Sequence, residues 1–90
     1  VFRIERKIFL HLPLEYADPR ISIKLSPEEG QELREKYETI RAAYHLNKRH
    51  WNDILIENTF PSDQILNWIL KSYYLVLNSL PKGLREKYQS

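Results

Sequence analysis

The stretch "RISIKLSPEEGQELREKY" (residues 20–37) decides the fold, because it places a strand directly before a helix. Apolar and polar side chains alternate through its first part, with the apolar set at Ile21, Ile23 and Leu25. Strict alternation is typical of a strand that buries one face of a sheet. The sequence therefore predicts a half-buried strand here.

The second part of the stretch carries the signals of a helix start. Ser26 is a typical N-cap residue, Pro27 suits the first helical position, and Glu29 stands where a capping box requires it. The apolar positions that follow are few and have helical spacing, at Leu33, Tyr37 and Ile40. We expect a surface helix over residues 26–40 that buries only a narrow stripe.

Downstream, "HWNDILIE" (residues 50–57) has the composition of another strand, and "NTFPSD" is a break. The longest periodic element follows. One broad helical face holds Ile65, Leu66, Ile69, Leu70, Tyr73, Val76, Leu77 and Leu80. Trp68 shares this spacing and is expected in the core. Pro81 ends the helix, and the tail has room for one or two further turns.

Upstream, "VFRIE" and "IFLHL" flank Arg6 and Lys7, which predicts a hairpin of two strands. The element order is then β-β-β-α-β-α in a single domain over residues 1–90. This order predicts an α+β two-layer sandwich, a mostly antiparallel sheet with the helices on one face. Since the chain has no methionine and starts directly on a strand, we expect it to be truncated at its N-terminus.

Alternation also assigns the two faces of the sheet. We expect the helix-facing set to be Ile4, Ile8, Leu10, Ile21, Ile23, Leu25, Ile54 and Ile56. The opposite set is Arg3, Phe9, His11, Lys24, Trp51, Asp53 and Leu55, which mixes cations with aromatic rings.

Charge and composition exclude several classes of protein. Fourteen basic and twelve acidic side chains leave a formal net charge of +2, so any nucleic-acid role must depend on local clustering of cations. The chain has no cysteine, which excludes disulfides and zinc ribbons and fits a cytoplasmic location. Its longest apolar run, residues 73–77, is too short to span a membrane, so no membrane partner is expected.

His45 and His50, with Asp53 nearby, are the residues from which a metal site would be built. On an extended segment five residues span about 16 Å, and His50 and Asp53 point to opposite faces of a strand. The sequence also lacks an HExxH spacing, a GxSxG elbow and a glycine-rich phosphate loop. We expect no metal, no cofactor, no catalytic residue and no enzyme activity, with a histidine-based hydrolase or metal enzyme as an alternative.

The stretch "YHLNKRHWN" (residues 44–52) combines the groups that nucleic-acid binding requires. These are cations for phosphates, and groups that stack on bases or hydrogen-bond to them. The candidate nucleic-acid-binding residues are Lys24, Arg41, His45, Asn47, Lys48, Arg49 and His50. Residue types alone favour a different interpretation, a solvated loop whose Tyr44 and Trp51 pack on the domain.

Two stretches, "YHLNKRHWNDI" (residues 44–54) and "FPSDQILNWILKSYYLVLNSLPKGLRE" (residues 60–86), resemble the MmcQ/YjbR family of small bacterial proteins. The shared pattern is aromatic-His-x-Asn-Lys-basic-His-Trp-Asn, then a short strand and a proline-started helix. The opening stretch of residues 20–37 also resembles the strand and capped helix of that family. The resemblance thus covers nearly the whole chain.

The resemblance implies a frataxin-like (CyaY-like) α+β domain, described as DNA-binding, with a further N-terminal helix before the first strand. The positions that match the family pattern are Tyr44, His45, Asn47, Lys48, His50, Trp51, Asn52, Ser72 and Tyr73. For Tyr44, Trp51, Asn52, Ser72 and Tyr73 a structural or mixed role is expected. With the resemblance included, nucleic-acid binding is as well supported as the solvated loop.

The leading hypothesis is therefore a DNA-binding domain, not an enzyme and favoured as a monomer. It would contact phosphates through Lys24, Arg41, Lys48 and Arg49. The alternative is a protein-interaction or small-ligand module that uses the open sheet face around Phe9, Trp51 and Leu55.

Overall fold

The structure, a computed structural model, describes residues 1–12, 19–43, 46–56 and 60–88. Five strands and three helices lie within these residues. In chain order they are β1 (Phe2–Ile4), β2 (Lys7–His11), β3 (Arg20–Lys24), α1 (Pro27–Lys36), β4 (Ile40–Ala42), β5 (Trp51–Leu55), α2 (Ser62–Asn78) and α3 (Lys82–Glu86).

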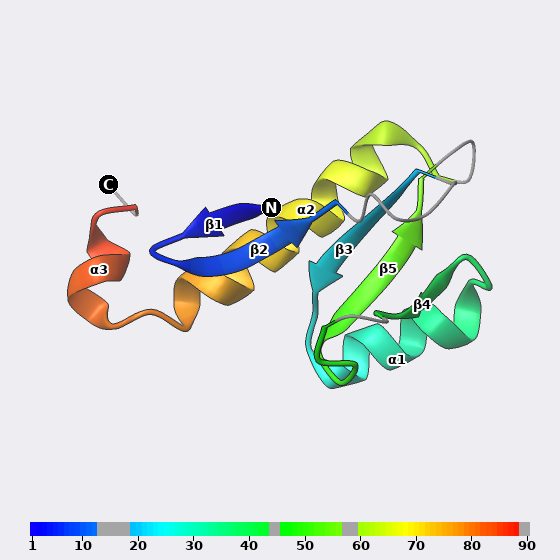
Figure 1. Cartoon of the computed structure of the whole chain (residues 1–90), viewed down its shortest axis with the longest axis horizontal. Coiled ribbons are helices and arrows are strands. Elements are labelled where there is room, and N and C mark those ends of the chain that lie inside the picture. The colour runs from blue at the N-terminus through cyan, green and yellow to red at the C-terminus, as the bar shows by residue number, and fades with distance from the viewer. Residues whose placement is uncertain (13–18, 44–45, 57–59, 89–90) are drawn as a thin grey trace.

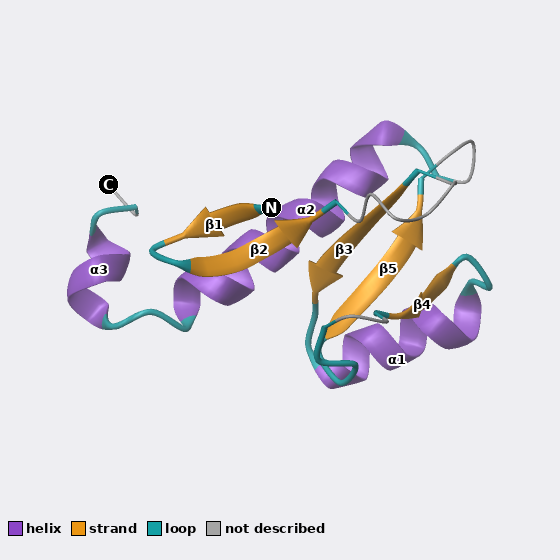
Figure 2. Cartoon of the chain, viewed as in Figure 1, coloured by secondary structure: helices purple, strands orange, loops and turns teal. Residues whose placement is uncertain are grey.

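The strands form one sheet in the order β1-β2-β3-β5-β4, and every neighbouring pair is antiparallel. Helix α2 crosses behind β2 and β3, and α1 lies along β4 (Figure 1). The predicted α+β fold, an antiparallel sheet with the long helices packed on one face, is confirmed (Figure 2). Among the described residues, no helix combines the length and apolarity that a membrane span requires.

Strand β4 was not expected, because the sequence predicts a helix over residues 26–40. In the structure the helix ends earlier, at Lys36. Ser26 caps α1 as predicted, with its hydroxyl accepting from the Glu29 backbone N–H. The helix ends at Lys36, and Tyr37 takes extended backbone angles. The chain can then turn back, so that Ile40 pairs with Ile54 and is buried.

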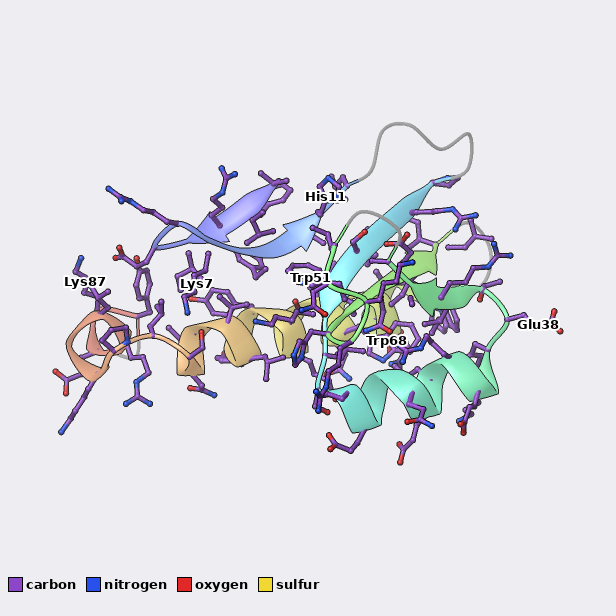
Figure 3. All side chains as sticks on the ribbon, turned by 60° about the horizontal axis from the view of Figure 1, so that its bottom comes forward. Lys7, His11, Glu38, Trp51, Trp68 and Lys87 are labelled. Carbon is purple, nitrogen blue, oxygen red and sulfur yellow. The ribbon has the colours of Figure 1, made fainter. Side chains whose placement is uncertain are left out.

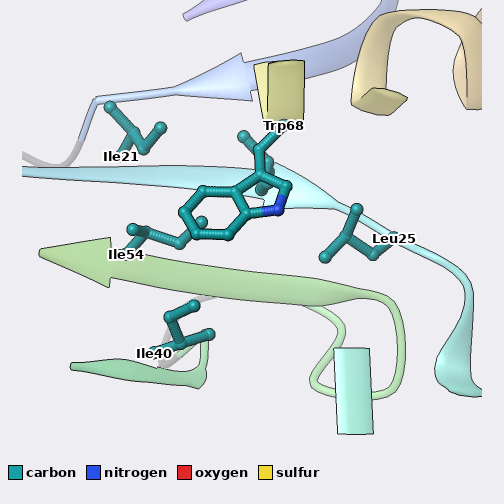
Figure 4. Close-up of a cluster of buried hydrophobic side chains, with 6 residues drawn as sticks. Ile21, Leu25, Ile40, Ile54 and Trp68 are labelled. Carbon is teal, nitrogen blue, oxygen red and sulfur yellow. The ribbon is translucent and has the colours of Figure 1, made fainter. Parts of the chain in front are cut away.

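The main core cluster lies between β3, β5, β4 and the first half of α2. Trp68 of α2 lies over the apolar side chains of these strands (Figure 4). Its buried members are Ile21, Ile23, Leu25, Ile40, Ile54 and Trp68. A second cluster, nearer α3, consists of Ile4, Val76, Leu77 and Leu80.

Helix α2 buries a narrower stripe than the sequence predicted. Trp68, Ser72 and Val76 are buried, whereas Leu66 and Leu70 are 56% and 42% exposed. The sheet covers only the side of the helix that carries the buried set, because it meets the helix along β2 and β3. The prediction that Leu66 and Leu70 face the core is therefore wrong.

The face prediction also fails on β2, where the alternation is interrupted. The β1–β2 register shifts between Phe2 and Arg3, which pair with Leu10 and Ile8 and leave Phe9 as the extra residue of a bulge. The Phe9 ring packs edge-on against Tyr73 of α2, with ring centroids 5.2 Å apart. Phe9 thus faces the helix, and Ile8 belongs to neither core cluster.

Ser72 joins α2 to the sheet at the point where β2 and β3 separate. Its hydroxyl accepts from the Lys24 backbone N–H at 2.8 Å and donates to the Phe9 carbonyl at 2.6 Å. The side chain is fully buried. Ser72 therefore satisfies two backbone groups that no longer bond to each other across the sheet, which is a structural role.

Candidate nucleic-acid interface

The segment between β4 and β5 contains a compact turn at Asn47–His50, which we call the basic turn. The Asn47 side-chain oxygen accepts from the Arg49 backbone N–H at 3.0 Å. The Asn47 carbonyl accepts from the backbone N–H groups of His50 and Trp51, at 3.2 and 2.9 Å. These bonds fix the backbone, and the side chains of Lys48 and Arg49 are exposed at its apex.

The basic turn is anchored to β3 and to α1. The His50 carbonyl accepts from the Leu25 backbone N–H at 2.8 Å and from the Asn52 side-chain nitrogen at 3.3 Å. The Asn52 side-chain oxygen in turn accepts from the Arg34 guanidinium of α1. Asn52 is completely buried against Gly30. Its side-chain amide is therefore bonded within the fold and is not available to a ligand.

The side of β3, β5 and β4 that faces away from the helices forms a second group of charges, which we call the cationic face. In register across the strands, His11 pairs with Ser22, Ser22 with Asp53, and Asp53 with Arg41. Arg20 and Lys24 flank Ser22 at alternate positions of β3 and therefore share its face. Five cations belong to the cationic face and the adjoining basic turn: Arg20, Lys24, Arg41, Lys48 and Arg49.

The only carboxylate in this strand register is Asp53, within the described residues, and it is shielded. Asp53 is 5% exposed and accepts a hydrogen bond of 2.5 Å from the Ser22 hydroxyl, which is itself buried. The hydrogen bond stabilises the carboxylate in this buried position. Its negative charge offsets part of the field of the neighbouring cations.

The acidic residues of α1 lie on the other side of the sheet. They are Glu28, Glu29, Glu32 and Glu35, on a helix whose Leu33 packs toward the main core. Glu29 forms an ion pair with Lys71 of α2, which keeps that carboxylate among the helices. The acids of α1 are accompanied by Arg34 and Lys36, whereas the cationic face and the basic turn hold five cations and one shielded carboxylate within the described residues.

The cations extend over a surface large enough for several phosphates. Arg20 and Lys24 are four residues apart on β3, which is about 13 Å, and three adjacent strands add about 10 Å across. The basic turn extends this surface beyond Lys24, because His50 bonds to Leu25. One DNA strand carries a phosphate every 3.4 Å or so along the axis, so several phosphates fit within reach.

The other expected site residues have diverse positions. His50 is half-buried and contributes its backbone to the turn, and the oxygen of the Asn47 side chain is engaged within the turn. Trp51 is 8% exposed, so the prediction that it lies open on the sheet is wrong. Ser72 and Tyr73 lie on α2, away from the cationic face. Tyr44 and His45 lie outside the described residues, as does part of the loop that follows β5.

Sequence reasoning missed two contributors. Arg20 continues the alternation of Ser22 and Lys24 toward the N-terminus, so the sequence pattern could have placed it on the same face. Arg34 stands one helical turn after Gly30, and its bond to Asn52 is a long-range contact that no local pattern reveals. In the part of the chain that the structure describes, no group of three or more metal-ligating side chains could hold an ion.

Comparisons with known proteins identify the family of the chain. Residues 1–75 match the model of the YjbR family. The uncharacterized protein YjbR of Escherichia coli strain K12 is 35% identical over 68 residues, which is 76% of this chain and 58% of that protein. The uncharacterized protein YbdF of Escherichia coli O157:H7 is 30% identical over 87 residues, or 91% of this chain and 67% of that protein.

A solved structure gives the same fold. The crystal structure of a Deinococcus radiodurans protein with the DUF419 domain superposes with a TM-score of 0.80 at 31% identity. The match covers 88% of this chain and 59% of that one. A Pseudomonas syringae protein matches with a TM-score of 0.59 at 30% identity, over 71% of this chain and 56% of its own. The chain thus spans a little over half the length of several relatives that it matches.

Proposed function

The chain belongs to the YjbR family, and on that premise we propose that it is a small DNA-binding protein, not an enzyme, that holds phosphates on the cationic face and the basic turn. The observation that carries the proposal is the gathering of cations on one face of the sheet and on the basic turn beside it. Arg41 is exposed on the face that it shares with Asp53, and Lys48 and Arg49 are exposed at the apex of the basic turn beside it. A chain of low net charge can attract DNA only where its cations gather in this way.

The basic turn supports phosphate binding more than base reading. Its backbone is fixed by three hydrogen bonds to Asn47, so its cations are held close together before a ligand arrives. The side-chain oxygen of Asn47 and both polar atoms of the Asn52 side chain already have partners within the fold, which leaves few groups to read bases. We therefore expect binding that is weak, salt-dependent and largely independent of sequence.

A catalytic role for the row His11, Ser22 and Asp53 has less support. A nucleophilic serine donates to a base that then passes the proton on, and it must be open to substrate. Ser22 is 2% exposed and donates directly to Asp53. The pair is better explained as a buried carboxylate with its hydrogen-bond donor.

The interaction module on the open sheet face also loses support. Phe9 packs on Tyr73 and Trp51 is buried, so of the three apolar side chains assigned to that surface only Leu55 is partly exposed there. A contiguous exposed apolar patch is what such a module would require.

The proposal is tested by fluorescence anisotropy with a labelled DNA duplex. If five phosphates are contacted, affinity should fall about 500-fold between roughly 50 and 200 mM salt. Replacing Lys48 and Arg49 together with Ala should reduce the slope of log affinity against log salt by about 2. Changing Lys82 and Lys87 of the α3 region to Ala removes the same charge from the far end of the molecule and should leave the slope unchanged.

Affinity that ignores salt, or an equal loss in both double variants, would contradict the proposal. The first outcome would exclude phosphate contacts, and the second would show that only the total charge matters. Figure 3 shows how far Lys87 lies from Trp51, where β5 begins beside the basic turn.

A further inference from the structure

We infer that the cationic face and the basic turn select double-stranded over single-stranded DNA, an inference that rests on the proposed function. Two features of the surface point to it, the absence of exposed aromatic rings among its described residues and the fixed spacing of its cations. Neither feature is needed for DNA binding as such, so the preference can fail while DNA binding holds.

Aromatic rings on the described part of the chain are either buried or elsewhere. Trp51 is the aromatic residue on the strands of the cationic face, and it is 8% exposed. The exposed rings are Phe2, Tyr74 and Tyr88, on β1, α2 and the residues after α3. Proteins that bind single strands use exposed rings on which successive bases stack. The cationic face offers no such platform in the residues that the structure describes.

Where a surface binds DNA through cations alone, its affinity depends on the charge density of the DNA. A duplex carries one negative charge per 1.7 Å or so of axis, roughly twice the density of one of its strands. The basic turn holds Lys48 and Arg49 on a backbone fixed through Asn47, and Lys24 and Arg41 stand on paired strands. The backbone positions that carry these cations keep their spacing, which suits a stiff phosphate array better than a flexible strand that must be ordered on binding.

The size of the preference follows from counterion release. The salt slope is about 0.9 per phosphate contact on duplex DNA and about 0.7 on single strands. With five contacts, and equal affinities at molar salt, the duplex should bind about 20-fold more tightly at roughly 50 mM salt. The ratio should shrink steadily as salt is added.

The experiment compares a labelled duplex of about 20 base pairs with an unstructured oligothymidine of equal length, by anisotropy across a salt series. A duplex preference near 20-fold at low salt, with the steeper slope, is the expected result. Equal or tighter binding of the oligothymidine would overturn the inference and leave the proposed function standing. No salt-dependent binding of either probe would overturn both.

A second test of the inference uses Tyr44, which lies outside the described residues. The Tyr44→Ala variant should keep both affinities, and hence the ratio, within about twofold if stacking plays no part. If that variant loses affinity for oligothymidine at least tenfold while duplex binding persists, a stacking site is present, and the argument from missing rings is wrong. The Lys48→Ala and Arg49→Ala double variant should weaken both probes, with the larger loss on the duplex.

Discussion

The two ends of the sheet are built differently. At one end, which we call the three-strand end, β3, β4 and β5 pack with α1 and the first half of α2, and most residues of β3 and β5 are buried. At the other, the hairpin end, β1 and β2 meet the second half of α2 and α3, and most of their residues are partly or fully exposed. The candidate interface lies entirely on the three-strand end.

The contacts of the two ends differ in the same sense. The three-strand end has a buried polar bond from Ser22 to Asp53 and a part-buried one from Arg34 to Asn52. The hairpin end is held by exposed ones, from Lys7 to Ser79 and from Lys87 and Tyr88 to Glu5. Buried bonds are costly to break and hold side chains in fixed positions. The charges of the candidate interface thus stand on the end of the sheet whose backbone is fixed by the more buried contacts.

The strongest test of the comparison removes the bond that links the two ends. Ser72→Ala leaves the Lys24 N–H and the Phe9 carbonyl buried without a partner, and should lower the free energy of unfolding by about 2 to 4 kcal/mol. Ser79→Ala on the exposed turn of the same helix should cost less than about 0.5 kcal/mol. Urea denaturation followed by circular dichroism measures both. Similar losses in the two variants would refute the linking role of Ser72.

The two glycines, Gly30 and Gly83, lie at opposite ends, and replacing each with alanine should change the stability of the protein in opposite directions. A Cβ at Gly30 would lie 3.1 Å from both polar atoms of the Asn52 side chain, which is held by Arg34 and cannot easily move. We expect Gly30→Ala to destabilise the protein by about 1 to 2 kcal/mol. Gly83 has open space around it, so Gly83→Ala should stabilise the protein by about 0.5 to 1 kcal/mol. Thermal unfolding of the two variants side by side gives the signs.

A smaller effect is expected when the buried carboxylate of the three-strand end is neutralised. In Asp53→Asn the side-chain oxygen can still accept from Ser22, so the free energy of unfolding should change by less than about 1 kcal/mol. Removing a negative charge among the cations should raise DNA affinity about fivefold at low salt. Glu32→Gln on α1 makes the same change in net charge behind the sheet and should alter affinity less than about twofold. Anisotropy titrations that show equal gains would sink the idea of a distinct cationic face.

The smallest expected change in stability concerns Glu5 at the hairpin end, and it depends on pH. Hydrogen bonds from Tyr88 and then Lys87 lower the pKa of Glu5 below its usual value of 4.5. A lowered folded-state pKa adds stability above the unfolded pKa, and this is lost as pH falls through the folded value. Wild type should thus exceed Glu5→Gln slightly in stability at neutral pH, with the difference vanishing in acid below pH 4.5. A difference that persists in acid would rule out the carboxylate as its source.

Sequence reasoning located the strand at Ile21, Ile23 and Leu25 and the cap at Ser26 because both depend on local spacing. It also placed Trp68 correctly in the core. It missed β4, since helical spacing from Leu33 continues by chance through Ile40. A strand of three residues is specified by its partner β5, and no local pattern announces it.

The exposed faces were harder to predict than the strands themselves. Phe9 turned to α2 because one bulge shifts the register of β2, and bulges leave no reliable mark in a short alternating run. For the candidate interface, Lys24, Arg41, Lys48 and Arg49 could be named from composition and resemblance. Their common side of the sheet could be known only from the pairing of β3, β5 and β4.

The turn between β1 and β2 places Glu5 and Arg6 at positive φ angles of 48° and 72°, where residues with side chains are disfavoured. Glu5 nonetheless stands there and reaches Tyr88, a partner 83 positions away in the chain. Closing so long a loop is slow in folding, because its entropy is lost before its contacts form. We therefore expect the region around α3 to dock last during folding. In native-state hydrogen exchange its amides should exchange first, while those of β3 and β5 under the surface proposed for DNA stay protected.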